Sequence, residues 1–209
     1  MKTITKTKTA LASACLLCAV SGLADMGNAG PYAGIGLGST AFSDNGMIDD
    51  INRELGSYTF ELDDSSAGFK LYGGYKFNKI AAVEAAFTHY GDFHVKEYVF
   101  GTSGTFSPSS LSLSANLGYD FADGQFRPFA LIGLSRVDLD EWVDDDKGVG
   151  IHIGFGVQYD PKQFNGFGFR LAYEGDAFSV DTGISGAAYV DENYGQSLGM
   201  LYLSAHYRF

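Results

Sequence analysis

Apolar and polar residues alternate with a period of two along eight segments of this chain. The segments cover about 31–42, 66–77, 80–92, 108–121, 126–140, 148–160, 166–178 and 196–209. Most run for ten residues or more, which is longer than the usual soluble strand of about 5–6 residues. The pattern therefore predicts eight long β-strands.

The connections between these segments alternate in length. The short ones are 78–79, 122–125 and 161–165, and the long ones are 43–65, 93–107, 141–147 and 179–195. Neighbouring antiparallel strands would then have short turns at one end of the sheet and longer loops at the other. Outer-membrane barrels have the same asymmetry, with periplasmic turns and extracellular loops.

The two faces of the predicted strands differ in composition, which indicates which one faces inward. One face is glycine-rich and also carries Lys70, Glu84, Asn116, Gln158 and Arg170, whereas the other is aliphatic and aromatic without a charge. Glycines weaken a solvated strand, but small residues make room for large ones inside a narrow barrel. We therefore predict an all-β fold, an eight-stranded antiparallel up-and-down transmembrane β-barrel over residues 30–209, in preference to a soluble barrel with an apolar interior. Segment 126–140 is apolar at both parities, so its orientation stays open.

Aromatic residues recur beside the short turns on the apolar face. A ring of such residues is typical of the aromatic girdle at a membrane interface. The predicted periplasmic girdle contains Tyr75, Phe77, Tyr119, Phe121 and Tyr159.

The first residues have the features of a secretory signal peptide. Lys2, Lys6 and Lys8 precede the short apolar stretch 10–20, and small residues follow it. The stretch is too short to span a bilayer as a helix. We predict a signal peptide over residues 1–24, with cleavage as late as residue 29, and export to the outer membrane of a Gram-negative cell.

Charge and cysteine content exclude several classes of function. Without the three lysines of residues 1–24, the chain has 11 basic and 25 acidic residues, which gives a net charge of −14. This balance argues against nucleic acid as a partner, since phosphate contacts need clustered basic residues. Both cysteines, Cys15 and Cys18, lie in the predicted signal peptide. Acidic residues cluster at 49–50, 61–64, 138–147 and 191–192. These clusters lack a calcium-loop spacing, so we expect a solvated acidic surface and neither a metal nor a cofactor.

Several motifs resemble the transmembrane domain of OmpA-type proteins, within the small-barrel group that includes OmpX- and Ail-like proteins. They are PYAGIGLG, GGYKFNKIAAVEAAFTHYG, SANLGYDF, GFGVQYD with FRLAYE, and GMLYLSAHYRF. The resemblance covers residues 30–209 and has no counterpart of the peptidoglycan-binding domain, so no wall anchor is expected. It implies that the last strand is read by the barrel-assembly machinery through Phe209, Tyr207, Leu203 and Leu201; alternatively, Phe209 is only a girdle residue.

The same resemblance implies a role for two interior charges. Glu84 and Arg170 lie about six and five residues from short turns, so both should lie at one depth and form an interior ion pair. They match a glutamate and an arginine of the family's interior gate. Asn116 and Gln158 match the competing lysine and second glutamate of that gate, and both are neutral here. A structural plug is therefore favoured over a gate.

The expected function is that of a non-enzymatic outer-membrane protein. It would serve surface structure, envelope integrity or adhesion, with membrane lipid, lipopolysaccharide and a host or surface ligand of the loops as partners. A narrow pore for small solutes is the first alternative and a lipid A-modifying enzyme the second. The four histidines show no His-x-Ser arrangement like that of barrel deacylases, which argues against catalysis.

Overall fold

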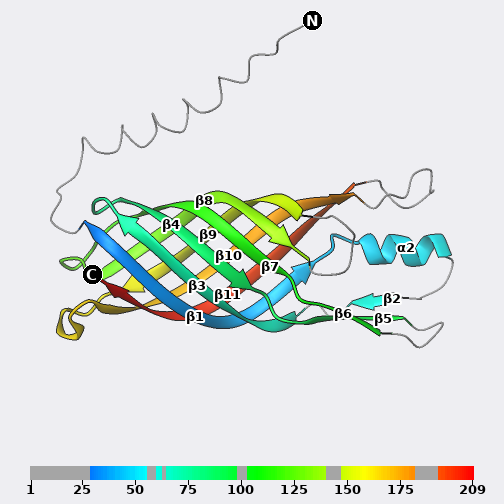
Figure 1. Ribbon diagram of the computed structural model, residues 1–209, viewed down its shortest axis with the longest axis horizontal. Helices are drawn as coiled ribbons and strands as arrows, with labels where there is room; N and C mark the ends of the chain where they lie inside the picture. Colours follow the sequence, from blue (N-terminus) through cyan, green and yellow to red (C-terminus); the bar gives the residue numbers. More distant parts are fainter. Residues whose placement is uncertain (1–28, 56–59, 63–64, 98–102, 140–146, 182–192) are drawn as a thin grey trace, which may run out of the picture.

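A computed structural model describes residues 29–55, 60–62, 65–97, 103–139, 147–181 and 193–209. The predicted signal peptide lies outside these residues. Eight strands form a closed antiparallel barrel (Figure 1). They are β1 (Gly30–Ser43), β3 (Ser65–Lys76), β4 (Ala81–His89), β7 (Ser109–Gly118), β8 (Phe126–Asp138), β9 (Lys147–Tyr159), β10 (Phe167–Asp181) and β11 (Asn193–Arg208). This confirms the predicted eight-stranded barrel.

The barrel closes where its first strand pairs with its last. β1 and β11 are in register from Tyr32↔Arg208 to Ser43↔Ser197, and β1 pairs with β3 along its other edge. Every barrel strand therefore has two hydrogen-bonded neighbours. A sheet in lipid needs this closure because an open edge would leave backbone groups unsatisfied.

The outer wall is apolar and the interior is polar, which is the reverse of a soluble barrel. Large outward side chains such as Leu37, Leu113 and Phe155 are 60–68% exposed. The inward positions bury Lys70, Glu84 and many other polar residues. Inward glycines supply space: a Cβ on Gly34 would lie 2.4 Å from the Tyr72 ring.

Strand β8 takes one of the two orientations that its sequence leaves open. Arg127, Phe129 and Leu131 are buried in the lumen, whereas Ile132 and Leu134 are 59% and 63% exposed on the outer wall. The lumen is thus apolar in part, which explains why strict alternation fails in this strand.

Two of the expected long loops contain regular structure beyond the barrel. Segment 43–65 includes α2 (Met47–Leu55) and β2 (Phe60–Leu62), and segment 93–107 includes β5 (Phe93–Glu97) and β6 (Ser103–Phe106). β2, β5 and β6 form a separate three-stranded sheet at the end of the barrel opposite the short turns (Figure 1). None of the helices in the described residues has the length and apolar character that crossing a bilayer requires.

The short turns have local sequence causes. Asn78 Oδ1 accepts hydrogen bonds from the backbone amides of Ile80 and Ala81, each at 2.8 Å, and so closes the β3–β4 turn. The β9–β10 turn contains the short 3₁₀ helix η1 (Lys162–Phe164) and then Asn165 and Gly166, both with positive φ. Asparagine and glycine tolerate this conformation best.

Candidate functional site

The barrel interior contains an ion pair that crosses the lumen between Glu84 on β4 and Arg170 on β10. The guanidinium donates two parallel hydrogen bonds, Nη1 to Oε1 and Nη2 to Oε2, each 2.9 Å long. The two strands are not neighbours in the barrel, so the pair spans the interior. Glu84 is 2% and Arg170 1% exposed, and a bidentate pair of this kind is the geometry that best offsets desolvation.

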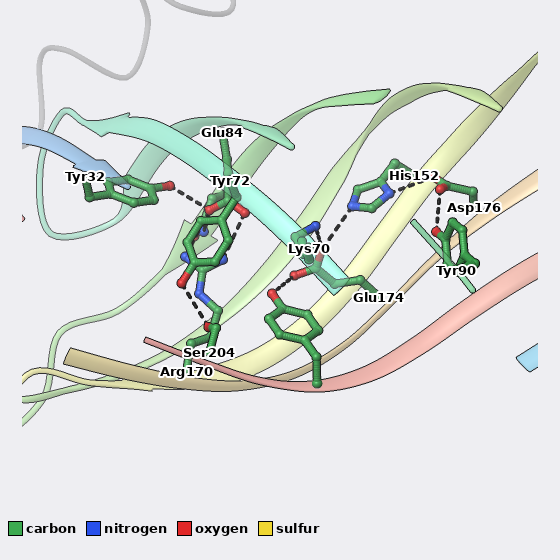
Figure 2. Close-up of polar contacts among 12 residues, drawn as sticks. Tyr32, Lys70, Tyr72, Glu84, Tyr90, His152, Arg170, Glu174, Asp176 and Ser204 are labelled. Atoms are coloured by element: carbon green, nitrogen blue, oxygen red, sulfur yellow. Dashed lines mark hydrogen bonds and ion pairs between the residues drawn. The ribbon is translucent and has the colours of Figure 1, made fainter. Parts of the chain in front are cut away.

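Several side chains contact this pair, among them those of Tyr32 and Tyr72 (Figure 2). The Tyr32 hydroxyl donates to Glu84 at 2.7 Å, and Asn116 Nδ2 donates to the same carboxylate at 3.2 Å. The Arg170 guanidinium lies 4.2 Å from the centre of the Tyr72 ring and 4.7 Å from that of Phe129. Contacts of this density fix both charges in one arrangement.

The neutral positions of the family gate take part in other hydrogen bonds. Asn116 Oδ1 accepts from Arg127 Nη1 at 2.6 Å, so Asn116 links Glu84 to a second arginine. Gln158 Nε2 donates to Asp160 at 2.9 Å, and Gln158 lies opposite Arg170 in the register of β9 and β10. Arg127 lies in the lumen because of the orientation of β8, which the sequence alone leaves open.

A second layer of buried charge lies next to the first, toward the end opposite the short turns (Figure 2). Lys70 Nζ lies 2.5 Å from Glu174 Oε2, and Tyr202 donates to the other oxygen of Glu174. His152 bridges Glu174 at 3.2 Å and Asp176 at 2.7 Å. The interior thus contains a lysine–glutamate pair, Lys70 and Glu174. Its positions differ from Asn116 and Gln158, which match the family gate.

Tyr90 also belongs to this second layer. The Tyr90 hydroxyl donates to Asp176 at 2.6 Å and so extends the network to the residue that follows β4.

Glu174 and Asp176 share the inward parity of Arg170 on β10, which is the signal by which sequence analysis could have found them. Sequence analysis missed them because parity gives no partner across the lumen.

The outer end of the lumen is filled by an apolar cluster. Phe42, Val137, Phe178, Leu198 and Met200 are at most 7% exposed and belong to one cluster with Phe93 and Phe106. In the described part of the chain, buried side chains thus occur from the Lys76–Asp120 pair near the short turns, through the two charged layers, to this cluster. An eight-stranded barrel is just narrow enough for side chains to fill it.

The predicted girdle residues lie beside the short turns. Tyr75 and Phe77 have ring centres 5.4 Å apart, and those of Tyr119 and Phe121 are 5.0 Å apart. Tyr159 stacks on Phe126 at 4.7 Å.

The residues of the predicted assembly signal lie along the outer face of β11 and just beyond it. Leu201 and Leu203 are 54% and 62% exposed, and Phe209 is 74% exposed. The Phe209 amide donates to the Pro31 carbonyl at 3.1 Å, and its ring lies 5.0 Å from that of Tyr207. Phe209 thus has few side-chain contacts within the barrel.

Asp160 lies in the short turn after β9, outside the spanning strands. His206 Nε2 donates to its carboxylate at 2.6 Å, and Arg208 Nη1 lies 3.7 Å away. Burial opposes ionisation, but the hydrogen bonds from His206 and Gln158 and the charge of Arg208 outweigh it and lower the pKa of Asp160 below its usual value.

We expect Asp160→Asn to destabilise the barrel at pH 7 but not in strong acid. Because the folded-state pKa of Asp160 lies below the unfolded value, its ionised form stabilises the fold above about pH 4. That contribution disappears as the pH falls through the folded-state pKa. Urea unfolding midpoints of the two proteins in the same detergent should therefore converge in acid, and a gap that stays constant to low pH would contradict the assignment.

Comparison with known proteins agrees with this architecture. The family model described as "Outer membrane protein beta-barrel domain" matches residues 10–209. No curated protein gave a significant match. Neisserial surface protein A has 18% identity and a TM-score of 0.52, with 87% of this chain and 99% of that one covered.

Two other solved structures are similar. The outer membrane protein AlkL has 15% identity and a TM-score of 0.51, with 87% of this chain and 91% of that one covered. Ail of Yersinia pestis has 18% identity, with 87% and 99% covered, but a TM-score of only 0.49. At these identities, Neisserial surface protein A and AlkL support the fold alone. The family match, which spans nearly the whole sequence, shows that the chain belongs to the outer membrane protein β-barrel family.

Proposed function

We propose that this protein is a non-enzymatic outer-membrane barrel that serves surface structure, envelope integrity or adhesion. The observation that supports this most directly is the filled lumen. Arg170, Lys70 and Tyr202 are each 1% exposed, and so is Met200 in the apolar cluster. Buried side chains along the described part of the lumen support a barrel that is closed to solutes and functions through its outer surfaces.

The part of the chain beyond the barrel supports a role in contacts at the cell surface. Phe42 of β1 packs against Phe93 of β5 and Phe106 of β6, with ring centres 5.9 and 5.4 Å apart. This buried aromatic group joins the three-stranded sheet to the barrel. Rigid attachment suits a surface that presents contacts to a host or surface ligand, since ordering it on binding would cost little.

The interior chemistry argues against an enzyme. Both ring nitrogens of His152 contact carboxylates, and the residue is only 1% exposed. A catalytic base must reach its substrate, and none can approach His152 inside the filled lumen. The proposal therefore includes neither catalysis on lipid A nor a cofactor. The proposed partners are membrane lipid and lipopolysaccharide around the wall, and the barrel-assembly machinery during insertion.

The filled lumen predicts that the refolded protein does not conduct ions steadily. In planar bilayers we expect no open level for the wild type and a measurable one for Glu84→Ala/Arg170→Ala, because the double variant removes the bridge across the lumen. Lys162→Ala, at an exposed turn, serves as the control and should behave as the wild type. A large steady conductance of the wild type that the double variant leaves unchanged would favour the narrow pore.

The surface role needs a separate measurement on the same refolded protein. Vesicles that carry the barrel should bind cells or surface ligands more strongly than protein-free vesicles of the same lipids. Mass spectrometry of lipid A from a deletion strain provides the test of enzyme activity, and a modification that depends on this protein would overturn the proposal.

A further inference from the structure

His152 lies on β9 and points into the lumen beside two carboxylates of the neighbouring strand β10 (Figure 2). Its Nδ1 is 2.7 Å from Asp176 Oδ1, and its Nε2 is 3.2 Å from Glu174 Oε2. His152 and Asp176 are each 1% exposed, and Glu174 is 3% exposed. Both nitrogens of the ring thus face carboxylate oxygens in a buried layer of the lumen.

The two carboxylates also accept hydrogen bonds from other groups. The Tyr90 hydroxyl donates to Asp176 Oδ2 at 2.6 Å. Lys70 Nζ lies 2.5 Å from Glu174 Oε2, and the Tyr202 hydroxyl donates to Glu174 Oε1. A carboxylate that accepts at both oxygens is ionised and has no proton to share with the imidazole. A neutral imidazole has only one N–H group, whereas the imidazolium has two, so only the imidazolium can donate to both carboxylates.

The charge balance of this layer leads to the same protonation state. Lys70 contributes one positive charge, whereas Glu174 and Asp176 contribute two negative charges. On the other side of β9, the residue opposite His152 in the register of β8 is Gly133, which has no charge. The layer is therefore neutral only when His152 is positive, and an uncompensated charge in a buried site is strongly destabilising.

Loss of the second ring proton would disturb contacts beyond the ring itself. One nitrogen would then turn a lone pair toward a carboxylate oxygen, and the layer would carry a net negative charge. Asp176 also accepts from Tyr90, and the Thr40 hydroxyl donates to the Tyr90 carbonyl at 2.6 Å. The protonated ring is thus one link in a chain of hydrogen bonds that joins β9 and β10 to β1.

We propose that His152 is an imidazolium in the folded barrel at neutral pH, and that the release of its proton in alkaline solution is a switch that weakens the barrel. In the unfolded chain, a histidine is mostly neutral above about pH 7. The folded barrel then holds one proton more than the unfolded chain. The stability linked to this proton is fully present in mild acid and decreases as the pH rises, until the folded barrel also loses the proton. This inference does not depend on the surface role proposed above.

Nitrogen NMR of the full barrel, refolded in detergent micelles, measures the protonation state directly. The chain has four histidines, so the variant His89→Gln/His94→Gln/His206→Gln keeps His152 as its one histidine. At about pH 8 we expect an attached proton on both ring nitrogens of the folded barrel, and one bare nitrogen after unfolding in urea. A bare ring nitrogen in the folded barrel at this pH would overturn the proposal.

The switch itself is tested by urea unfolding between about pH 7 and pH 9. The unfolding equilibrium constant of the wild type should rise about ten-fold more per pH unit than that of His152→Gln, because only the wild type releases this proton on unfolding. Tyr72→Phe is the matched control. It removes a buried hydroxyl that contacts Ser204 at 2.9 Å, outside the second layer, and should keep the wild-type pH dependence.

The pH dependence can also contradict the proposal. Equal pH dependence in the wild type and His152→Gln, or an equal loss of it in Tyr72→Phe, would show that no switch exists at His152. Gel mobility with and without boiling checks that each variant is folded. If His152→Gln does not fold, Asp176→Asn removes one of the two carboxylates and should also reduce the pH dependence, and the NMR measurement stands without either variant.

Discussion

Arg170→Ala should destabilise the barrel by about 3–5 kcal/mol, the typical effect of removing one partner of a buried ion pair. Among the described residues, the variant leaves the Glu84 carboxylate in the lumen with Tyr32 and Asn116 as its hydrogen-bond donors. It also removes the guanidinium from between the Tyr72 and Phe129 rings. The change is measured by equilibrium unfolding in urea of the protein in lipid vesicles, with gel mobility as the readout of the folded fraction.

Two controls separate the charge effect from a general loss of packing. Glu84→Gln/Arg170→Met removes both charges and keeps much of the volume, so it should be clearly more stable than Arg170→Ala. Lys162→Ala removes an exposed pair with Asp123, in which the side chains are 62% and 85% exposed, and should change stability by no more than about 0.5 kcal/mol. If Arg170→Ala were as mild as Lys162→Ala, the lumen would have to be hydrated.

The barrel itself could be predicted from the sequence because lipid imposes strict rules on a spanning sheet. Each strand must be long, and the sheet must close, so alternation and turn length together specify the order of the strands. Counting from the short turns places Glu84 and Arg170 at one depth, and the structure has them 2.9 Å apart. Register is most certain near short turns, and both residues lie near one.

The parts that sequence reasoning missed follow other rules. β2, β5 and β6 have three to five residues each, too few for alternation to stand out from chance. Helix α2 buries Ile48 and Asn52, a single contact row along nine residues. These elements are specified by tertiary contacts, above all by the packing of Phe42 on Phe93 and Phe106, which no local pattern reveals.

The second charged layer was missed for a geometric reason. Parity alone assigns Lys70, His152, Glu174 and Asp176 to the inside. Whether they meet depends on the relative shift of three strands, β3, β9 and β10, since a shift by two residues keeps parity but moves each side chain by about 7 Å. In the middle of long strands, far from any turn, the sequence does not fix that shift.

Phe209→Ala should reduce the amount of barrel in the outer membrane of cells roughly ten-fold, which equals about 1.4 kcal/mol of recognition energy. The reason is that the Phe209 ring is 74% exposed and contacts Tyr207 at 5.0 Å, so it is available to an assembly partner before the barrel closes. The loss of folded stability should stay near ~1 kcal/mol, the size of one aromatic pair. Quantitative blotting of outer-membrane fractions measures the first effect, and unfolding of protein refolded from urea measures the second.

Phe167→Ala is a closely matched control for this prediction. Phe167 also contacts Tyr207, at 4.8 Å, and is 58% exposed at the same end of the barrel, but it belongs to β10. If Phe209 acts only as part of the aromatic girdle, both variants should lose similar amounts of stability and of assembled protein. If it acts in recognition by the assembly machinery, only Phe209→Ala should lose assembled protein far beyond its loss of stability. The ratio of the two effects, compared between the two variants, therefore distinguishes a signal from an interface anchor.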